Sequence, residues 1–241
     1  MDTIVVYIEN ENKHIDFIKS LNLLNIPHHR LFEGEKWLGL FHKIQIYLDG
    51  LKEIDNEWVI LSDARDVLFY KDIETINNVY TKYYSNYDII VQAEDYEQGC
   101  DGFKPYYKKG LKRFEFGDDE FKYVCSGLIM GKRTILIEFF TELLDKLPEQ
   151  WRTMGTDQPS VAWGMANLSY NIGLDVECRL FQQMATNSFL DGKRTSVGVN
   201  FHLHFNKNFI KNTRTNNEPC IFHGAGNSFL HQVSKIIHHR Y

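Results

Sequence analysis

The chain has 241 residues, 43% of them hydrophobic and 24% charged, which is typical of a globular protein and excludes a disordered or low-complexity chain. Its net charge of −5 opposes binding to nucleic acid, because no stretch of sequence gathers the basic residues. No segment has the about 18 consecutive apolar residues of a membrane-spanning helix, and residues 1–10 lack the pattern of a signal peptide. We therefore expect neither a nucleic-acid nor a membrane partner. The oligomeric state is left open.

The first part of the chain alternates between strand and helix patterns. Thr3–Ile8 is β-branched and apolar, as in a buried strand, and residues 13–24 then carry apolar side chains at helical spacing. After Pro27 a short extended piece is expected. The same reasoning predicts helices at 37–51 and 72–84, the latter capped by Asp72, and strands at 57–61 and 88–93.

The second part begins with a polar segment at 95–121, long enough to be a functional lid over a ligand or a disordered segment. A helix at 156–168 is expected to begin with Thr156 as its N-cap and Asp157 near its positive end. The other expected elements are strands at 123–130, 174–177, 201–205 and 220–223 and helices at 134–147 and 228–239. No repeat or linker divides the chain. We predict a single α/β domain over residues 1–241, with a mainly parallel central sheet flanked by helices.

Two aspartates follow the expected strand at 57–61. Ligands of open α/β sheets bind beyond the carboxyl ends of the strands, where Asp63 and Asp66 lie. A DxxD pair in a turn can direct both carboxylates at one point, which suits a hard divalent cation. In the alternative, one aspartate caps the turn and the other pairs with Arg65, since aspartate is common in turns. The spacing alone leaves both interpretations open.

A second motif runs from His223 to Gly226. Its glycines, Gly224 and Gly226, let backbone N–H groups approach an anion, and its histidine offers a third metal ligand. The alternative is a partly buried histidine before a glycine turn. Taken with the aspartates, the motif predicts a divalent cation beside a site for a nucleotide diphosphate.

Several motifs occur in a characteristic order along the chain. They are Asp63-Ala-Arg-Asp66, Val91-Gln-Ala-Glu94, Ser126-Gly127, Asp157-Gln158, Leu174-Asp175 followed by Cys178 and Phe181-Gln182, and His223-Gly-Ala-Gly226. In this order they resemble the glycosyltransferase domain of procollagen lysyl hydroxylases and its viral relatives, over about residues 37–229. The resemblance implies a GT-A fold and transfer of a sugar from a UDP-sugar with the help of Mn²⁺.

The resemblance also implies roles for single residues. Asp63, Asp66 and His223 would hold the metal, which would neutralise the diphosphate leaving group. Trp37 and Lys43 would lie along the donor site, although both also fit as the core and solvent faces of one helix. The other residues expected to line the donor site are Arg65, Glu94, Ser126, Gly127, Gly224 and Gly226.

Asp157 matches an acid that faces the transferred sugar in the family. It would position the sugar or the acceptor, or act as the general base if the reaction inverts the anomeric centre. The alternative is a carboxylate that stabilises the start of its helix. The sequence does not distinguish retention from inversion.

The chain departs from the family at several site positions. Arg65 stands where the family has an aromatic residue that stacks on uracil, Gly155 and Thr156 stand for acids, Phe229 for a lysine, and Tyr7 and Glu9 for threonines. Because these changes alter the base pocket and remove positive charge near the diphosphate, they leave the donor sugar and the rate open.

Together the motifs predict a metal-dependent glycosyltransferase that moves a hexose from a UDP-sugar to an acceptor hydroxyl. The acceptor would be a hydroxylysine or galactosyl-hydroxylysine of a collagen-like protein, another protein or a glycan. With no export signal in the sequence, a cytoplasmic or viral-factory location is expected. Two alternatives remain: a metal-dependent phosphoesterase that uses the same cluster, and a catalytically weak nucleotide-sugar-binding protein.

Overall fold

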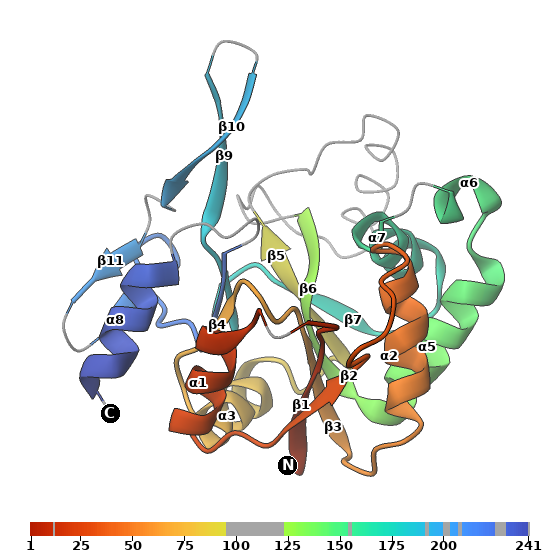
Figure 1. The fold of residues 1–241 in the computed structure, drawn as a ribbon, viewed down its shortest axis with the longest axis horizontal. Coiled ribbons are helices and arrows are strands. Elements are labelled where there is room, and N and C mark those ends of the chain that lie inside the picture. The colour runs from red at the N-terminus through yellow and green to blue at the C-terminus, as the bar shows by residue number, and fades with distance from the viewer. Residues whose placement is uncertain are drawn as a thin grey trace.

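The computed structural model describes residues 1–11, 13–94, 123–153, 156–190, 193–199, 203–206, 209–224 and 230–240. At its centre is a six-stranded sheet in the order β2-β1-β3-β6-β5-β7 (Figure 1). Its strands are β1 (Thr3–Ile8), β2 (His28–Leu31), β3 (Trp58–Ser62), β5 (Ile89–Glu94), β6 (Tyr123–Lys132) and β7 (Ile172–Asp175). Only β6 is antiparallel to its neighbours, so the prediction of a mainly parallel sheet is confirmed.

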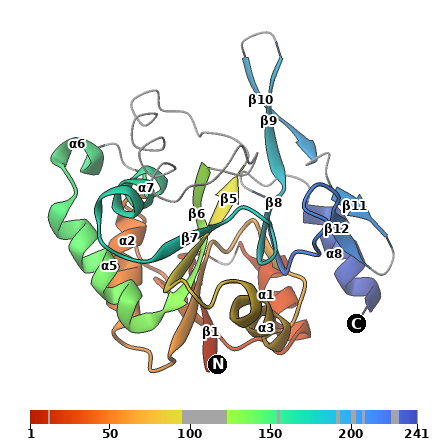
Figure 2. The ribbon, with the colours of Figure 1, turned by 180° about the vertical axis from the view of Figure 1, so that it is seen from behind.

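Helices cover both faces of this sheet (Figures 1 and 2). On β1, the neighbouring Val5 and Val6 are both fully buried but belong to different cores, since successive side chains of a strand point to opposite faces. The core of Val6 contains α2 (His42–Leu51), α5 (Arg133–Lys146) and α7 (Gln158–Asn167); that of Val5 contains α1 (Ile15–Leu23) and α3 (Ile73–Tyr83). The result is a three-layer α/β architecture.

A second, three-stranded sheet lies beside the first. It consists of β4 (Val67–Phe69), β13 (Ile221–His223) and β8 (Phe181–Gln183), in the order β4-β13-β8. Val233 and Ile237 of α8 (Leu230–Arg240) are buried against it. Because β13 is antiparallel to β4, His223 at the end of β13 pairs with Val67 at the start of β4. This register brings distant parts of the chain together at one point.

Two antiparallel hairpins and one short helix complete the described elements. The hairpins are β9 (Ala185–Leu190) with β10 (Lys193–Val199), which projects from the body in Figures 1 and 2, and β11 (Leu203–Phe205) with β12 (Ile210–Asn212). The helix is α6 (Glu149–Arg152). Sequence analysis predicted a strand at 201–205 but missed β4, β8, β9, β10 and β12.

Three predicted helix starts can be compared with the structure. Asp72 caps α3 as predicted, since its Oδ1 accepts a hydrogen bond from the Thr75 amide at 2.7 Å. The helix expected at 37–51 begins only at His42, because Gly39 has a φ of +112°, which is incompatible with a helix. Likewise α7 begins at Gln158, so its N-cap is Asp157 and not Thr156. The segment 95–121 lies outside the described residues.

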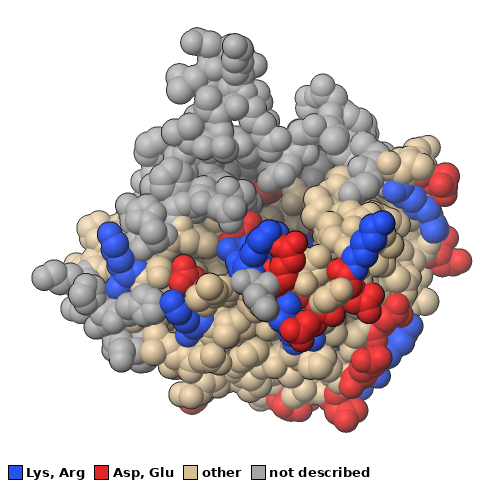
Figure 3. Space-filling view, in the orientation of Figure 1, with Lys and Arg blue, Asp and Glu red and all other residues tan. Residues whose placement is uncertain are grey.

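Within the described part of the chain, no helix combines the length and apolar character needed to cross a membrane. On the face shown in Figure 3, basic side chains are scattered among acidic ones and form no single patch.

Candidate metal centre and donor site

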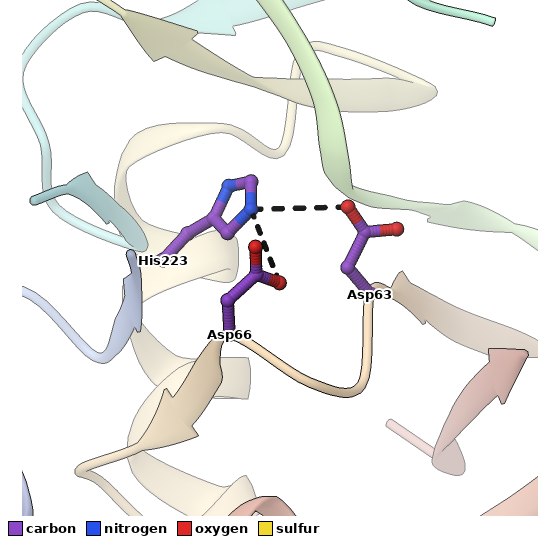
Figure 4. A group of neighbouring side chains, drawn as sticks. All are labelled: Asp63, Asp66 and His223. Atoms are coloured by element: carbon purple, nitrogen blue, oxygen red, sulfur yellow. Dashed lines mark ion pairs between the residues drawn. The ribbon is translucent and has the colours of Figure 1, made fainter. Parts of the chain in front are cut away.

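Asp63, Asp66 and His223 come together at the carboxyl edge of the central sheet (Figure 4). Each offers one ligand atom, and these atoms lie within 4.8 Å of one another. The Nε2 atom of His223 is 3.8 Å from Oδ2 of Asp63 and 3.6 Å from Oδ1 of Asp66. The three residues predicted as a metal cluster are therefore neighbours in space.

Backbone pairing holds this cluster together. Asp63 directly follows β3, and its N–H donates to the Gly127 carbonyl of β6 at 2.9 Å. Asp66 directly precedes β4, and its carbonyl accepts the Gly224 N–H at 2.7 Å. Each end of the DxxD turn is thus fixed to a different sheet, which directs both carboxylates toward the end of β13. Because its N–H is bonded to Asp66, Gly224 ties the cluster together.

The imidazole of His223 is 3% exposed. Its Nδ1 hydrogen-bonds Oε1 of Gln92 at 2.9 Å and lies 3.4 Å from Sγ of Cys125, whereas Nε2 has no hydrogen-bond partner within the described residues. A buried ring nitrogen that faces two carboxylates without a hydrogen bond is an arrangement that a divalent cation would satisfy. The side chains present therefore fit a metal ion.

Protonation of His223 opposes metal binding. Burial disfavours the charged imidazole, but Cys125 and the Asp66 carboxylate outweigh burial and hold the pKa of His223 well above its usual range. A cation at this site must displace that proton, as metals generally do from their protein ligands.

Gly127 lies against the imidazole of His223. A β-carbon at this position would lie 2.2 Å from Cε1 of His223, so only glycine leaves room for the imidazole. Ser126, beside it on β6, is 7% exposed, and its carbonyl accepts a hydrogen bond from Lys43 at 3.3 Å. Both residues therefore pack against the groups that would bind metal and donor.

Lys43 links the metal cluster to α7. Its Nζ donates hydrogen bonds to Oδ1 of Asp63 at 2.6 Å and to the Ser126 carbonyl, and it forms an ion pair with Oδ2 of Asp157 at 2.8 Å. Burial lowers the pKa of Lys43, but the two carboxylates outweigh it and raise the pKa well above its usual range. The alternative that Lys43 lies on the solvent face of a helix is wrong, since the residue is 5% exposed.

Asp157 is 5% exposed and its side chain makes no capping hydrogen bond to α7. Asp157 thus occupies the N-cap position of α7 without a capping hydrogen bond, and its carboxylate pairs with Lys43. Glu94, at the end of β5, is 2% exposed and accepts hydrogen bonds from Gln158 Nε2 at 2.7 Å and Gln183 Nε2 at 3.4 Å. Two acids predicted from the family motifs thus have fixed positions near the start of α7.

A cavity of about 370 Å³ adjoins the cluster, in the range typical of ligand pockets. Its walls include both aspartates, Lys43, Arg65 and Trp37. Trp37 lies before α2, is 38% exposed and packs edge-on against Phe32, with ring centroids 6.1 Å apart. The alternative that Trp37 is a core residue of this helix is therefore wrong.

Arg65 pairs with a residue that sequence analysis considered separately. Its Nε and Nη2 are each 2.8 Å from one carboxylate oxygen of Glu9, which is 2% exposed and belongs to the cavity wall. The alternative that Arg65 pairs with an aspartate of the DxxD turn is wrong. No sequence pattern indicates this contact, because Glu9 and Arg65 are far apart in the chain.

Three of the positions considered in the sequence cannot be placed in the site. Gly226, Gly155 and Phe229 lie outside the described residues.

The fold resembles those of two solved glycosyltransferases. One is a glycosyltransferase involved in the glycosylation of the major capsid of PBCV-1, with 10% identity, a TM-score of 0.53, and coverage of 99% of this chain and 98% of that one. The other is the galactosyltransferase LgtC in complex with donor and acceptor sugar analogues, with 11% identity, a TM-score of 0.55, and coverage of 98% and 95%. A search of curated protein sequences found no significant match. The fold class is that of GT-A glycosyltransferases.

The family is defined by the sequence. The family model described as the PLOD GT domain matches residues 3–237, which is nearly the whole chain. The chain therefore belongs to the PLOD glycosyltransferase-domain family, which confirms the predicted resemblance and that the protein is a glycosyltransferase.

Proposed function

We propose that this glycosyltransferase transfers a hexose from a UDP-sugar to an acceptor hydroxyl, with a divalent cation held by Asp63, Asp66 and His223. The observation that carries the proposal is Nε2 of buried His223, which makes no hydrogen bond among the described residues and faces both carboxylates beside a cavity of about 370 Å³. When bound, the cation, Mn²⁺ in our proposal, supplies Lewis-acid neutralisation of the diphosphate.

The cavity is the proposed donor site. Since Asp63 and Asp66 belong to its wall, the diphosphate would lie at the aspartates and the nucleoside along Trp37 and Arg65. The guanidinium of Arg65, held flat by two hydrogen bonds to Glu9, offers a surface on which a base can stack. Lys43 contributes positive charge at the phosphate end and keeps Asp63 in place.

The sugar would lie toward α7 and the end of β5. Glu94, Ser126 and Gly127 are proposed to border the hexose, and Asp157 to position the sugar or the acceptor hydroxyl. Lys43 already contacts the Asp157 carboxylate at 2.8 Å, and this ion pair holds the carboxylate in one place, which favours a positioning role for Asp157. The acceptor in this proposal is a hydroxyl-bearing protein, such as a hydroxylysine-containing chain, or a glycan.

The proposal is tested first by thermal stability. UDP, UDP-glucose, UDP-galactose, UDP-N-acetylglucosamine and GDP-mannose are each added with Mn²⁺ or with a chelator. A ligand at 100 times its Kd stabilises the native state by about 2.7 kcal/mol, which corresponds to about 5–10 °C for a protein of this size. We expect such a shift with uridine ligands and Mn²⁺ together. No shift with any of them would contradict nucleotide-sugar chemistry.

A turnover assay separates the remaining functions. A glycosyltransferase consumes the donor faster when a hydroxyl acceptor is added. Donor hydrolysis that no acceptor accelerates would indicate the phosphoesterase, and tight donor binding without turnover would indicate a binding protein.

A further inference from the structure

Gln92 has no role in the function proposed above, although it contacts the imidazole of the metal cluster. It lies on β5, is fully buried, and its Oε1 is 2.9 Å from Nδ1 of His223. The opposite side of the imidazole ring, at Nε2, faces Asp63 and Asp66. Gln92 and the proposed metal position are thus on opposite edges of one ring.

The direction of this hydrogen bond decides what Nε2 can do. A carbonyl oxygen only accepts, so Nδ1 must carry the proton in the contact with Oε1 of Gln92. A neutral imidazole protonated at Nδ1 keeps the lone pair of Nε2 for a metal. If the amide were rotated, its NH₂ group would donate to Nδ1, and Nε2 would then carry the proton and could not bind a cation. In the structure, the amide nitrogen of Gln92 has no hydrogen-bond partner among the described residues.

An irregularity in the sheet gives Gln92 this position. The register of β5 and β6 shifts between Val91, which pairs with Ile129, and Gln92, which pairs with Cys125. Such irregularities redirect side chains near functional sites. Here the shift places the side chains of Gln92 and Cys125 at the same nitrogen, while Gly127 of the intervening segment leaves the space that the ring fills.

We propose that Gln92 is a positioning residue of the metal site: its side-chain carbonyl fixes the Nδ1–H form of His223, so that Nε2 is presented to a divalent cation together with Asp63 and Asp66. This inference rests on the proposed function, because it requires that the cluster binds a cation. Outer partners of this kind typically change metal affinity by about 10- to 100-fold when they are removed.

The test measures the affinity of Mn²⁺ alone, by titration calorimetry, for the wild type and three variants. Gln92→Met keeps the size of the side chain but removes the acceptor, and Gln92→Glu keeps an acceptor that cannot reverse its direction. The matched control is Gln182→Met, since Gln182 is an equally buried glutamine on β8 that pairs with Phe222 and has its own partner, Asn212. A fourth variant, His223→Asn, identifies the His223 signals in ¹⁵N spectra of the imidazole groups.

We expect Gln92→Met to bind Mn²⁺ about 10- to 100-fold more weakly than the wild type. Gln92→Glu and Gln182→Met should lose no more than about threefold in Mn²⁺ affinity. In the Mg²⁺-loaded wild type, the ¹⁵N spectrum should show Nδ1 protonated and Nε2 unprotonated. If Gln92→Met does not fold, the ¹⁵N spectrum of the wild type and the Mn²⁺ affinity of Gln92→Glu still test the inference.

Three results would overturn the inference: unchanged Mn²⁺ affinity in Gln92→Met, an equal loss in Gln92→Glu, or a proton on Nε2 in the loaded wild type. If the wild type binds no Mn²⁺ and gains no Mn²⁺-dependent affinity for UDP, the proposed function fails and this inference fails with it. Normal Mn²⁺ binding by the wild type together with any of the three results removes the role of Gln92 alone.

Discussion

A single aspartate, Asp175, and the pair Asp63 and Asp66 lie at the same edge of the central sheet but in opposite surroundings. Asp175 ends β7 and is fully buried. Its carboxylate accepts the backbone N–H groups of Arg179, Leu180 and Phe181 at 3.0, 2.8 and 2.7 Å and the hydroxyl of Tyr84. Every contact comes from a fixed donor, as expected of a carboxylate that organises a turn.

Asp63 and Asp66, in contrast, face one another and His223. Burial raises the pKa of Asp63, and the attraction of Lys43 and His223 only partly offsets it, while the charge of Asp66 acts in the same direction as burial. A carboxylate surrounded by donors stabilises the fold, whereas two carboxylates directed at one point favour binding of a cation. The two regions should therefore respond in opposite ways to the same substitution, aspartate to asparagine.

The largest effect is expected for Asp66→Asn. It removes one proposed metal ligand without changing side-chain volume, so Mn²⁺-dependent UDP binding should be abolished in calorimetry. The melting temperature without ligand should stay within about 3 °C of the wild type, because the lost attraction between Asp66 and His223 is offset by the lost repulsion between Asp66 and Asp63. Asp55→Asn, an exposed residue before β3, is the matched control. An unaltered Mn²⁺-dependent affinity for UDP would remove Asp66 from the site.

Asp157→Asn examines a carboxylate that is buried, as Asp175 is, but that pairs with a single lysine and not with several fixed donors. If Asp157 positions the reacting groups, UDP binding should persist and sugar transfer should fall by about 100-fold. Steady-state kinetics of transfer, with UDP affinity measured in parallel, provide the readout. Wild-type turnover in this variant would exclude the proposed role.

Asp175→Asn should give the reverse of Asp66→Asn. The amide would place NH₂ against groups that are themselves donors, and the loss should be about 2 kcal/mol of unfolding free energy, or about 4–8 °C in melting temperature. The Mn²⁺-dependent shift with UDP should remain. Urea unfolding measures the first quantity. If Asp175→Asn were as stable as the wild type but failed to bind UDP, Asp175 would belong to the binding site and not to the stabilising contacts of the fold.

The smallest effect concerns Glu9, in the wall of the cavity. Burial raises the pKa of Glu9, but the hydrogen bonds from Arg65 outweigh it and hold the pKa below its ordinary value. Because the pKa of Glu9 is lower in the folded chain than in the unfolded chain, the charged carboxylate stabilises the fold at pH values above its unfolded pKa of about 4.3. This stabilisation is lost as the pH falls through the pKa of Glu9 in the folded chain. Arg65 is 46% exposed, so solvent screens much of the pair.

For Glu9→Gln we therefore expect a melting temperature about 1–3 °C below the wild type at pH 7. The difference should shrink toward pH 3, where the wild-type carboxyl is also protonated. Thermal melts at pH 7, 5, 4 and 3 provide the comparison. A difference that grows on acidification would contradict the sign derived from the pKa of Glu9.

Local sequence patterns predicted the sheet strands and the helices that follow them, because apolar periodicity reports burial on one face or two. They failed at α2, where Trp37 continues the apolar pattern but Gly39 interrupts the helix. They also missed the β9–β10 hairpin, although the Asp191-Gly192 dipeptide between its strands is a common hairpin-turn sequence.

The candidate site was predictable only where a motif carried it. Asp63, Asp66 and His223 were named from their types and order, and the structure places them together. Gln92 belongs to the motif Val91-Gln-Ala-Glu94, but the sequence suggested no function for it. Its contact with His223 depends on a register shift between β5 and β6, which no local sequence pattern indicates. The pairing of Glu9 with Arg65 likewise depends on how β1 lies beside the DxxD turn.

The antiparallel pairing of β13 with β4 also has a consequence for synthesis of the chain. His223 lies near the carboxyl end of this sequence, whereas Asp63 and Asp66 lie in its first third. A ribosome-bound chain that has been synthesised only as far as the residue before β13 has both carboxylates but no imidazole. At that stage β4, which follows the DxxD turn, also lacks β13 as its partner strand. Closing such a long loop is slow and entropically costly, so a complete cluster marks a chain that has been synthesised through β13 and has paired β13 with β4.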